Sequence, residues 1–155
     1  MARHPGRQAG GDPALSRGGH GTRAGALAPA RFDHVGFVVA DLEVAAQAFG
    51  RLLGPYEPRE IPEVGLRARV YLGGTVEVLS FRGDVPGLDP RVTRPCPGLH
   101  HLAVRVPNLG DALARFQASG FGVLDGFPRP GLHGPIAFLA DPVSGRLLEL
   151  VEVPG

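Results

Sequence analysis

Apolar and polar residues alternate along several short stretches of the chain, and two other stretches have helical spacing. In the first half, this pattern predicts a strand over 32–42, a helix over 41–54 and two strands over 66–74 and 75–81. Asp41 suits the helix N-cap, Val44, Ala48 and Leu52 fall on one helical face, and Gly54 ends the helix. The last two strands are joined at two adjacent glycines, which predicts a hairpin.

The same order of elements returns after a proline-rich segment. Residues 83–97 hold four prolines in fifteen positions, which predicts a linker. His34 precedes Leu42 by eight residues and His101 precedes Leu109 by eight, so the spacing repeats as well as the order. The second set of elements consists of a strand over 99–109, a helix over 108–122, a short strand over 121–127 and a strand pair over 135–142 and 146–153.

This duplication predicts an α+β protein of two repeated βαβββ modules, over 31–82 and 98–153, within one domain over 31–155. A module of this size is marginally stable alone, so the two should share a core or a cleft. Residues 1–30 carry four arginines against one aspartate and have no apolar periodicity. We expect them to form a disordered tail.

Four side chains that bind metals well occupy matching places in the two modules. Strand periodicity puts His34, Glu77, His101 and Glu149 on the strand face that points away from the helices. An ionised glutamate among apolar strand neighbours is costly unless it is paired or bound to a cation. The set therefore predicts one divalent ion, of Zn, Ni, Co, Mn or Fe. The alternative is that each is the polar face of a half-exposed sheet.

Other side chains are candidates for binding a substrate. The same periodicity separates Arg67, Arg69 and Tyr71 from the apolar positions of their strand, so we expect them on the face of the cleft. Guanidinium groups match anionic substrate groups, although edge-strand arginines are also common in solvent. His133 lies in a loop that could reach a substrate, and His100 should point away from His101.

Composition excludes several classes of function. The 16 basic residues are all arginine, so neither a Schiff-base lysine nor a P-loop lysine is present. The single cysteine, Cys96, excludes an intrachain disulfide and a multi-cysteine zinc site. No apolar run approaches the roughly 18 residues of a membrane span, and a net charge of +1 gives no reason to expect a nucleic acid. We expect a cytoplasmic protein with a small-molecule substrate.

Four motifs carry a resemblance to a known family, and together they cover about residues 32–153: DHVGFVVADLEVA, GLHHLAVRVPNLGDAL, PRPGLHGPIAFL and LLELVE. The chain resembles the vicinal oxygen chelate superfamily (glyoxalase, bleomycin resistance and dioxygenase proteins), most strongly its methylmalonyl-CoA epimerase-like branch. The resemblance implies one curved, cup-shaped mixed sheet, with a single metal at its centre held by His34, Glu77, His101 and Glu149. Homodimers are common among such relatives, so a homodimer is expected.

The resemblance also implies a reaction. A metal-dependent isomerase, epimerase or lyase of this type chelates two vicinal substrate oxygens and moves a proton next to a carbonyl. Glu149 is the expected base, with Glu77 next, and the substrate would be anionic or an acyl-CoA. The epimerases resemble each other in a second carboxylate base on the second strand of the first module. That strand, LRARVYL, has none, and Glu60 and Glu63 fall in the preceding loop.

Two other functions are compatible with the family. A metal-free protein that sequesters an antibiotic would not need the four ligand-type residues. An Fe(II) dioxygenase would use two histidines and one carboxylate, so Glu77 as a fourth ligand argues against it.

Overall fold

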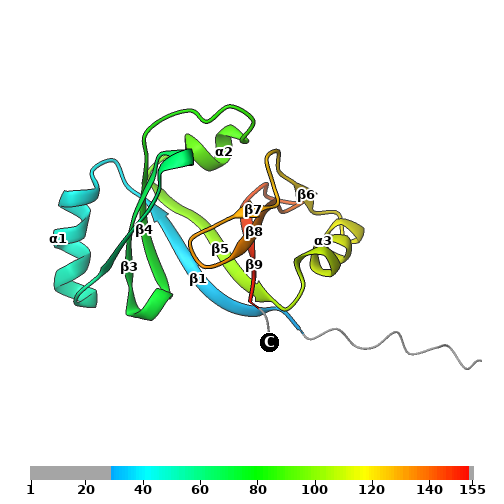
Figure 1. The fold of residues 1–155 in the computed structure, drawn as a ribbon, viewed down its shortest axis with the longest axis horizontal. Helices are drawn as coiled ribbons and strands as arrows, with labels where there is room; N and C mark the ends of the chain where they lie inside the picture. Colours follow the sequence, from blue (N-terminus) through cyan, green and yellow to red (C-terminus); the bar gives the residue numbers. More distant parts are fainter. Residues whose placement is uncertain (1–28, 154–155) are drawn as a thin grey trace, which may run out of the picture.

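Two antiparallel strands from different halves of the chain form the centre of the molecule (Figure 1). The computed structural model describes residues 29–153, and these central strands are β1 (Arg31–Val38) and β5 (Gly98–Val106). They belong to a mixed sheet whose path runs through β2 (Glu57–Ile61), β3 (Leu66–Tyr71), β4 (Val76–Phe81), β1, β5, β9 (Leu147–Glu152), β8 (Pro135–Ala140) and β6 (Gly122–Val123), with β7 (Arg129–Pro130) paired to β8.

The strand pairings on the two sides of this central pair repeat each other. β1 pairs in parallel with β4, which pairs antiparallel with β3, and β3 with β2. In the same way β5 pairs in parallel with β9, which pairs antiparallel with β8, and β8 with β6. The predicted α+β fold of two repeated modules is therefore confirmed. We call β1–β4 the N-terminal module, β5–β9 the C-terminal module, and the β1–β5 pair the seam.

Each module carries one helix on the outside of its strands, as Figure 1 shows. Helix α1 (Leu42–Leu53) packs against β3 and β4, and α3 (Leu109–Ala118) packs against β6, β8 and β9. Both begin at a capping side chain: Asp41 accepts hydrogen bonds from two first-turn amides, and Asn108 accepts one. The face predicted for α1 is wrong, because Val44 is 64% and Leu52 83% exposed. The helix instead buries Leu42 and Ala46, flanked by Ala45, Phe49 and Leu53.

The register of the seam shifts twice, at equivalent places in the two modules. Along β1 the partners change from Phe32↔Val104 to Val35↔Leu102, which leaves one extra residue on β1 at Asp33–His34. Farther along, they change from Gly36↔His101 to Phe37↔Leu99, which leaves one extra residue on β5 at His100. Such bulges redirect side chains. Each histidine expected to bind a metal thus directly follows an irregular position of its strand.

Two segments differ from the sequence-based expectation. Glu60, expected in a loop, lies in β2, an exposed edge strand over Glu57–Ile61, and a 3₁₀ turn, Pro62–Val64, follows it. The predicted linker contains a short helix, α2 (Pro90–Thr93), with Asp89 as its cap and proline in its first turn. The predicted hairpin is present, with the turn Leu72–Gly74 between β3 and β4.

The tail predicted over 1–30 lies almost wholly outside the described residues. Among the described residues, no helix is long and apolar enough to cross a membrane.

Candidate metal centre

Three buried side chains from three strands bring one polar atom each to a common point on the inner face of the sheet. His34 Nε2 of β1 lies 3.0 Å from His101 Nε2 of β5 and 3.1 Å from Glu149 Oε2 of β9. The third side of the triangle, from His101 Nε2 to Glu149 Oε2, is 3.0 Å. The exposed fractions of these residues are 1%, 3% and 5%. They form the group of described residues best suited to hold a metal ion.

The hydrogen bonds around these histidines determine which ring nitrogens carry protons. His34 Nδ1 lies 2.8 Å from Asp33 Oδ1, so it donates there, and in the neutral ring Nε2 keeps a lone pair. His100 Nε2 donates to the carbonyl of Arg91, at 3.3 Å, which leaves His100 Nδ1 to accept from His101 Nδ1 at 2.8 Å. The Nε2 of His101 therefore also keeps a lone pair. When both rings are neutral, two imidazole lone pairs and a carboxylate oxygen face one another, so a positive charge, either a proton or a metal ion, is favoured between them.

This donor set fits a divalent cation. Ligand atoms about 2.1 Å from a cation and at right angles to one another are about 3.0 Å apart, which matches all three sides of the triangle. Two imidazoles and one carboxylate suit Zn²⁺, Fe²⁺, Co²⁺, Ni²⁺ or Mn²⁺. Asp33 also accepts from Arg105, at 2.9 Å, so the carboxylate that orients His34 is itself fixed. Such outer contacts are usual around metal-binding histidines.

Electrostatics in the site favour a positive charge at this point. Burial lowers the pKa of His34, but Glu149, Glu77 and Asp33 outweigh it and raise the pKa to about 9. Burial raises the pKa of Glu149, but the two histidines outweigh it and lower the pKa to about 2. Burial and the neighbouring His101 lower the pKa of His100 to about 4, so His100 is neutral at pH 7. The neutral ring can then act as the hydrogen-bond acceptor described above.

Glu77 lies beside the triangle and has a different partner. Its Oε1 accepts from His133 Nε2 at 2.8 Å, and its Oε2 is 3.5 Å from His34 Nε2. The hydrogen bond to Glu77 raises the pKa of His133, against a smaller effect of burial. The structure therefore brings all four predicted ligands to one place, with three of them in the triangle and Glu77 next to His34.

A glycine makes room for one of the ligands. A Cβ at Gly36 would lie 2.2 Å from His101 Cε1 and within 2.7 Å of both ring nitrogens. Gly36 is also the seam partner of His101. The ring of His101 therefore rests directly on the backbone of β1, and a side chain at Gly36 would displace it.

The triangle opens into a pocket of about 580 Å³, including its mouth. The walls are mainly apolar, and segments far apart in sequence contribute to them. The N-terminal module supplies Ile61, Val64, Leu66, Leu79 and Phe81, the segment containing α2 supplies Leu88 and Val92, and the C-terminal module supplies Phe127, Leu132, Ile136, Phe138 and Val151. The polar lining residues, besides the ligands, are Glu77, His100, Arg129 and His133.

Three predicted substrate-binding residues are not on this pocket. Arg67 and Arg69 both donate to Glu43 of α1, at 2.9 and 2.7 Å, and the Tyr71 hydroxyl donates to the carbonyl of Ala46 in the same helix. Their predicted orientation is wrong because both faces of β3 are covered. The apolar residues Leu66, Ala68 and Val70 face the inside of the cup, and the polar ones lie under α1.

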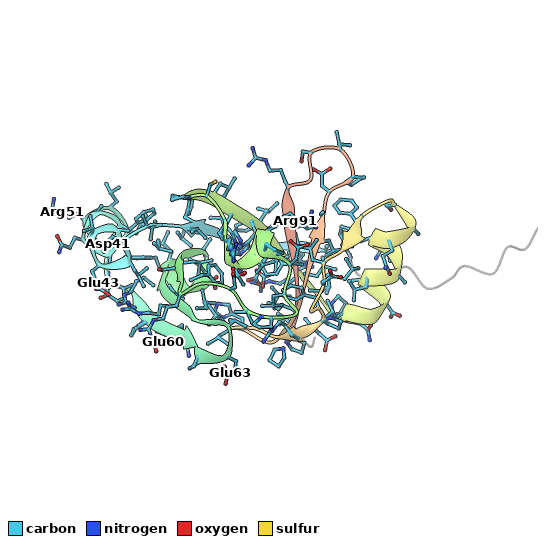
Figure 2. All side chains as sticks on the ribbon, turned by 90° about the horizontal axis from the view of Figure 1, so that it is seen from above. Asp41, Glu43, Arg51, Glu60, Glu63 and Arg91 are labelled. Atoms are coloured by element: carbon cyan, nitrogen blue, oxygen red, sulfur yellow. The ribbon has the colours of Figure 1, made fainter. Side chains whose placement is uncertain are left out.

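The fourth predicted substrate-binding residue, His133, does line the pocket. The inner face of β3 carries no carboxylate, as the sequence suggested. Figure 2 shows Glu60 and Glu63 at the outer edge of the molecule, and both are exposed.

The sequence did not identify Asp33, His100 or Arg129 as part of this site. His100 was expected to face away, but the bulge turns it inward beside His101, which makes that expectation wrong. Asp33 directly precedes a candidate ligand, so its position was a usable signal. Arg129 is in the PRPGLHGP motif that also contains His133, but nothing in the sequence indicates which residues of that loop face inward.

A curved mixed sheet of paired βαβββ modules with a His-His-Glu centre is the arrangement of the vicinal oxygen chelate fold. The chain belongs to the Glyoxalase/Bleomycin resistance protein/Dioxygenase superfamily, whose family model matches residues 33–138. It is 32% identical over 131 residues to an ethylmalonyl-CoA/methylmalonyl-CoA epimerase of Cereibacter sphaeroides. The aligned region covers 79% of this chain and 98% of the relative.

Other relatives belong to the same branch. A mitochondrial methylmalonyl-CoA epimerase of Homo sapiens is 31% identical, over 79% of this chain and 73% of its own length. Among solved structures, methylmalonyl-CoA epimerase from Mycobacterium tuberculosis superposes with a TM-score of 0.61 at 26% identity, over 80% of this chain and 87% of that one. The predicted superfamily and its epimerase-like branch are confirmed.

Proposed function

We propose that this protein is a metal-dependent enzyme of the epimerase and isomerase type, which removes the proton next to the carbonyl of a small acyl thioester. The observation that carries the proposal is the triangle of His34, His101 and Glu149, in which three atoms that can bind a metal converge 3.0–3.1 Å apart. The relatives named as epimerases of ethylmalonyl-CoA and methylmalonyl-CoA support an acyl-CoA as the substrate.

A divalent ion held by these three residues would supply chelation of two vicinal substrate oxygens and stabilisation of the enolate charge. The residues of the chain provide the rest. Glu149 is our candidate for the base, because its carboxylate lines the pocket beside both histidines of the triangle. The apolar walls exclude water from that position and strengthen the electrostatic interactions inside. Glu77 and His133 form a second hydrogen-bonded pair on the same pocket.

The stereochemical outcome depends on whether a second proton carrier faces Glu149. A two-base inversion needs an acid on the opposite side of the substrate, and the inner face of β3 offers only Leu66, Ala68 and Val70. The candidates that remain in the pocket are Glu77 and its partner His133. Without such a carrier, the chemistry would be proton exchange with retention, or a lyase reaction that starts from the same enolate.

Deuterium exchange tests this proposal. The protein is loaded with Zn²⁺, Co²⁺ or Mn²⁺ and incubated in D₂O with one of the two C2 epimers of methylmalonyl-CoA. We expect loss of the α-proton signal in NMR, at a rate that falls when the metal is removed by chelation. Chiral analysis of the product then separates inversion from exchange with retention. No exchange with any of these metals, on methylmalonyl-CoA or ethylmalonyl-CoA, would reject the proposed reaction.

One observation favours a second candidate, an Fe(II) dioxygenase. With Glu77 bonded to His133, the triangle alone is a set of two histidines and one carboxylate, which is the ligand set of non-haem Fe(II) oxygenases. Oxygen uptake by the Fe²⁺-loaded protein with catecholic substrates would support this function. A metal-free antibiotic-binding role is less well supported, because it needs no converging ligands. Metal analysis of protein purified without added metal tests that alternative.

We also propose that the protein is a homodimer that joins through the outer face of its seam. The three cross-strand pairs Phe32↔Val104, Val35↔Leu102 and Phe37↔Leu99 are all apolar. Helices α1 and α3 pack on the strands to either side, and Phe32, Leu99 and Leu102 remain 46–57% exposed. This strip is built from equivalent strands of both modules, so a twofold partner can match it. Light scattering should show a dimer that Leu102→Arg dissociates and the exposed-turn control Val143→Arg leaves intact.

A further inference from the structure

Arg129 is a charged pocket residue that the proposed chemistry does not use. It lies in β7, where its partner across the ladder is Ile136 of β8. Residues directly opposite each other in an antiparallel pair point to the same face of the sheet. Ile136 lines the pocket, as does its own partner on β9, Val151. The ladder therefore directs the Arg129 side chain into the pocket.

The same ladder places Arg129 close to the candidate metal centre. Phe138 pairs with Glu149, and Ile136, two residues before Phe138, pairs with Val151. Two residues along a strand span about 7 Å and neighbouring strands lie about 4.8 Å apart, so Arg129 belongs to the row next to that of Glu149 and lies two strands away from it. The arginine side chain reaches part of the way across this gap, and a substrate that extends from the triangle reaches the rest. A substrate held at the triangle thus passes within reach of the guanidinium.

Arg129 has no internal counter-ion among the residues that the structure describes. The two carboxylates of the pocket already have partners: Glu149 contacts His34 and His101, and Glu77 contacts His133. Among residues 29–153, no carboxylate lies within 4.0 Å of Arg129, and the other arginines without one, Arg31, Arg51, Arg82, Arg115 and Arg146, are all exposed. Its neighbours Leu132 and Ile136 are apolar. An arginine of intermediate burial in such surroundings is suited to an anion supplied from outside.

We propose that Arg129 is the anion-binding residue of this pocket, and that it takes a carboxylate or phosphate group of the substrate. The role first expected of Arg67 and Arg69 thus belongs to an arginine of the C-terminal module. Two parts of an acyl-CoA carry the required charge: the carboxylate of a malonyl-type acyl group and the phosphates of coenzyme A. The assignment of these sources rests on the proposed function, whereas anion binding at Arg129 does not.

Equilibrium binding separates the two sources without any catalysis. Malonate carries the acyl carboxylates without phosphate, and acetyl-CoA carries the phosphates without an acyl carboxylate. Calorimetric titration of each probe into the metal-loaded full-length protein is compared between wild type, Arg129→Met and Arg82→Met. Arg82 is an exposed arginine that does not line the pocket, so its variant removes the same charge from nearby. Arg129→Lys is included in case the methionine variant folds poorly.

We expect Arg129→Met to weaken binding of one probe by about 10-fold or more, as for loss of a charged hydrogen bond, while Arg82→Met changes it less than about 2-fold. A loss with malonate assigns Arg129 to the acyl carboxylate, and a loss with acetyl-CoA assigns it to the phosphates. Unchanged binding of both probes in Arg129→Met and Arg129→Lys overturns the proposal, as does a wild type that binds neither. Arg129-dependent binding without proton exchange would reject the proposed function and leave the anion site standing.

Discussion

In the N-terminal module a carboxylate holds the histidine of the triangle, whereas in the C-terminal module a second histidine does so. Asp33 accepts from His34, and His100 accepts from His101, and both acceptors directly precede their partner at a bulge of the seam. The backbone frame is thus repeated while the chemistry of the supporting residue is not. Asp33 brings a negative charge to its histidine, and His100 brings only a lone pair.

The two glutamates differ in the same way. Glu149 completes the triangle with both histidines, whereas Glu77 accepts a hydrogen bond from His133. Each glutamate nevertheless lies on the last strand of its module. The duplication therefore supplies two pairs of equivalent positions, and side chains that have no counterpart in the other module decide how each one is used. His133, in the segment between β7 and β8, has this effect on Glu77. Symmetry of the backbone does not imply symmetry of function.

The largest expected effect comes from removing either histidine of the triangle. If the modules contribute equally to the metal centre, His34→Ala and His101→Ala should each weaken divalent-metal binding by at least about 100-fold, since loss of outer partners alone costs about 10–100-fold. Chelator competition and elemental analysis of the purified variants measure this. A variant that keeps wild-type affinity would show that its module does not hold the metal.

Exchanging the two glutamates for glutamine should separate their roles. We expect Glu149→Gln to slow α-proton exchange by about 10²–10⁴-fold, as for loss of a general base. Glu77→Gln should have a smaller effect, because an amide oxygen still accepts from His133. Rates are compared at saturating metal, so that weaker metal binding does not mimic slower chemistry. Equal losses in the two variants would contradict the division of labour between the glutamates.

Asp33 and His100, which hold the two histidines of the triangle, should differ in their effect on metal binding, because only Asp33 carries a charge. Asp33→Ala is expected to weaken metal binding by about 10–100-fold, and His100→Phe by less, because a charged acceptor holds its donor more strongly than a neutral one. Phenylalanine keeps the ring that packs between Phe81 and Phe138, so the variant removes the acceptor and preserves the shape. Calorimetric titration with Zn²⁺ measures both. A larger effect of His100→Phe would reverse this ranking.

The smallest expected effect comes from substituting Gly36. Its counterpart in the C-terminal module is Ala103, which is fully buried with its Cβ in place. Gly36→Ala forces a Cβ against the ring of His101 and should cost about 1–3 kcal/mol of stability. Gly50→Ala in α1 meets nothing within 4 Å and should stabilise by about 0.5–1 kcal/mol. Urea unfolding measures both free energies, and a neutral Gly36→Ala would show that the ring has room to move.

Much of the fold could be predicted because its signals are periodic. The order of elements, the duplication and the inward positions of His34, Glu77, His101 and Glu149 follow from spacing and strand alternation. Edge strand β2 was missed because it is exposed on both faces and shows no alternation. Helix α2 was missed because one turn between prolines leaves no periodic pattern.

The errors in the site have two physical causes. Alternation in β3 separates two faces but does not say which one meets the helix, and Glu43 on α1 draws Arg67 and Arg69 to the outside. Strict alternation also fails at a bulge, which is why His100 faces inward beside His101. The position of Arg129 depends on pairing between β7 and β8, which local sequence does not specify.

The seam has a consequence for the continuity of the chain itself. The histidines of the triangle are 67 residues apart in sequence, and His34 and Glu149 are 115 apart, yet all three are carried by the seam or a strand directly paired to it. The peptide bonds between the modules do not position any of them. A chain cut between β4 and α2 keeps each candidate ligand on its own strand, so we expect the centre to form only when both halves pair along the seam.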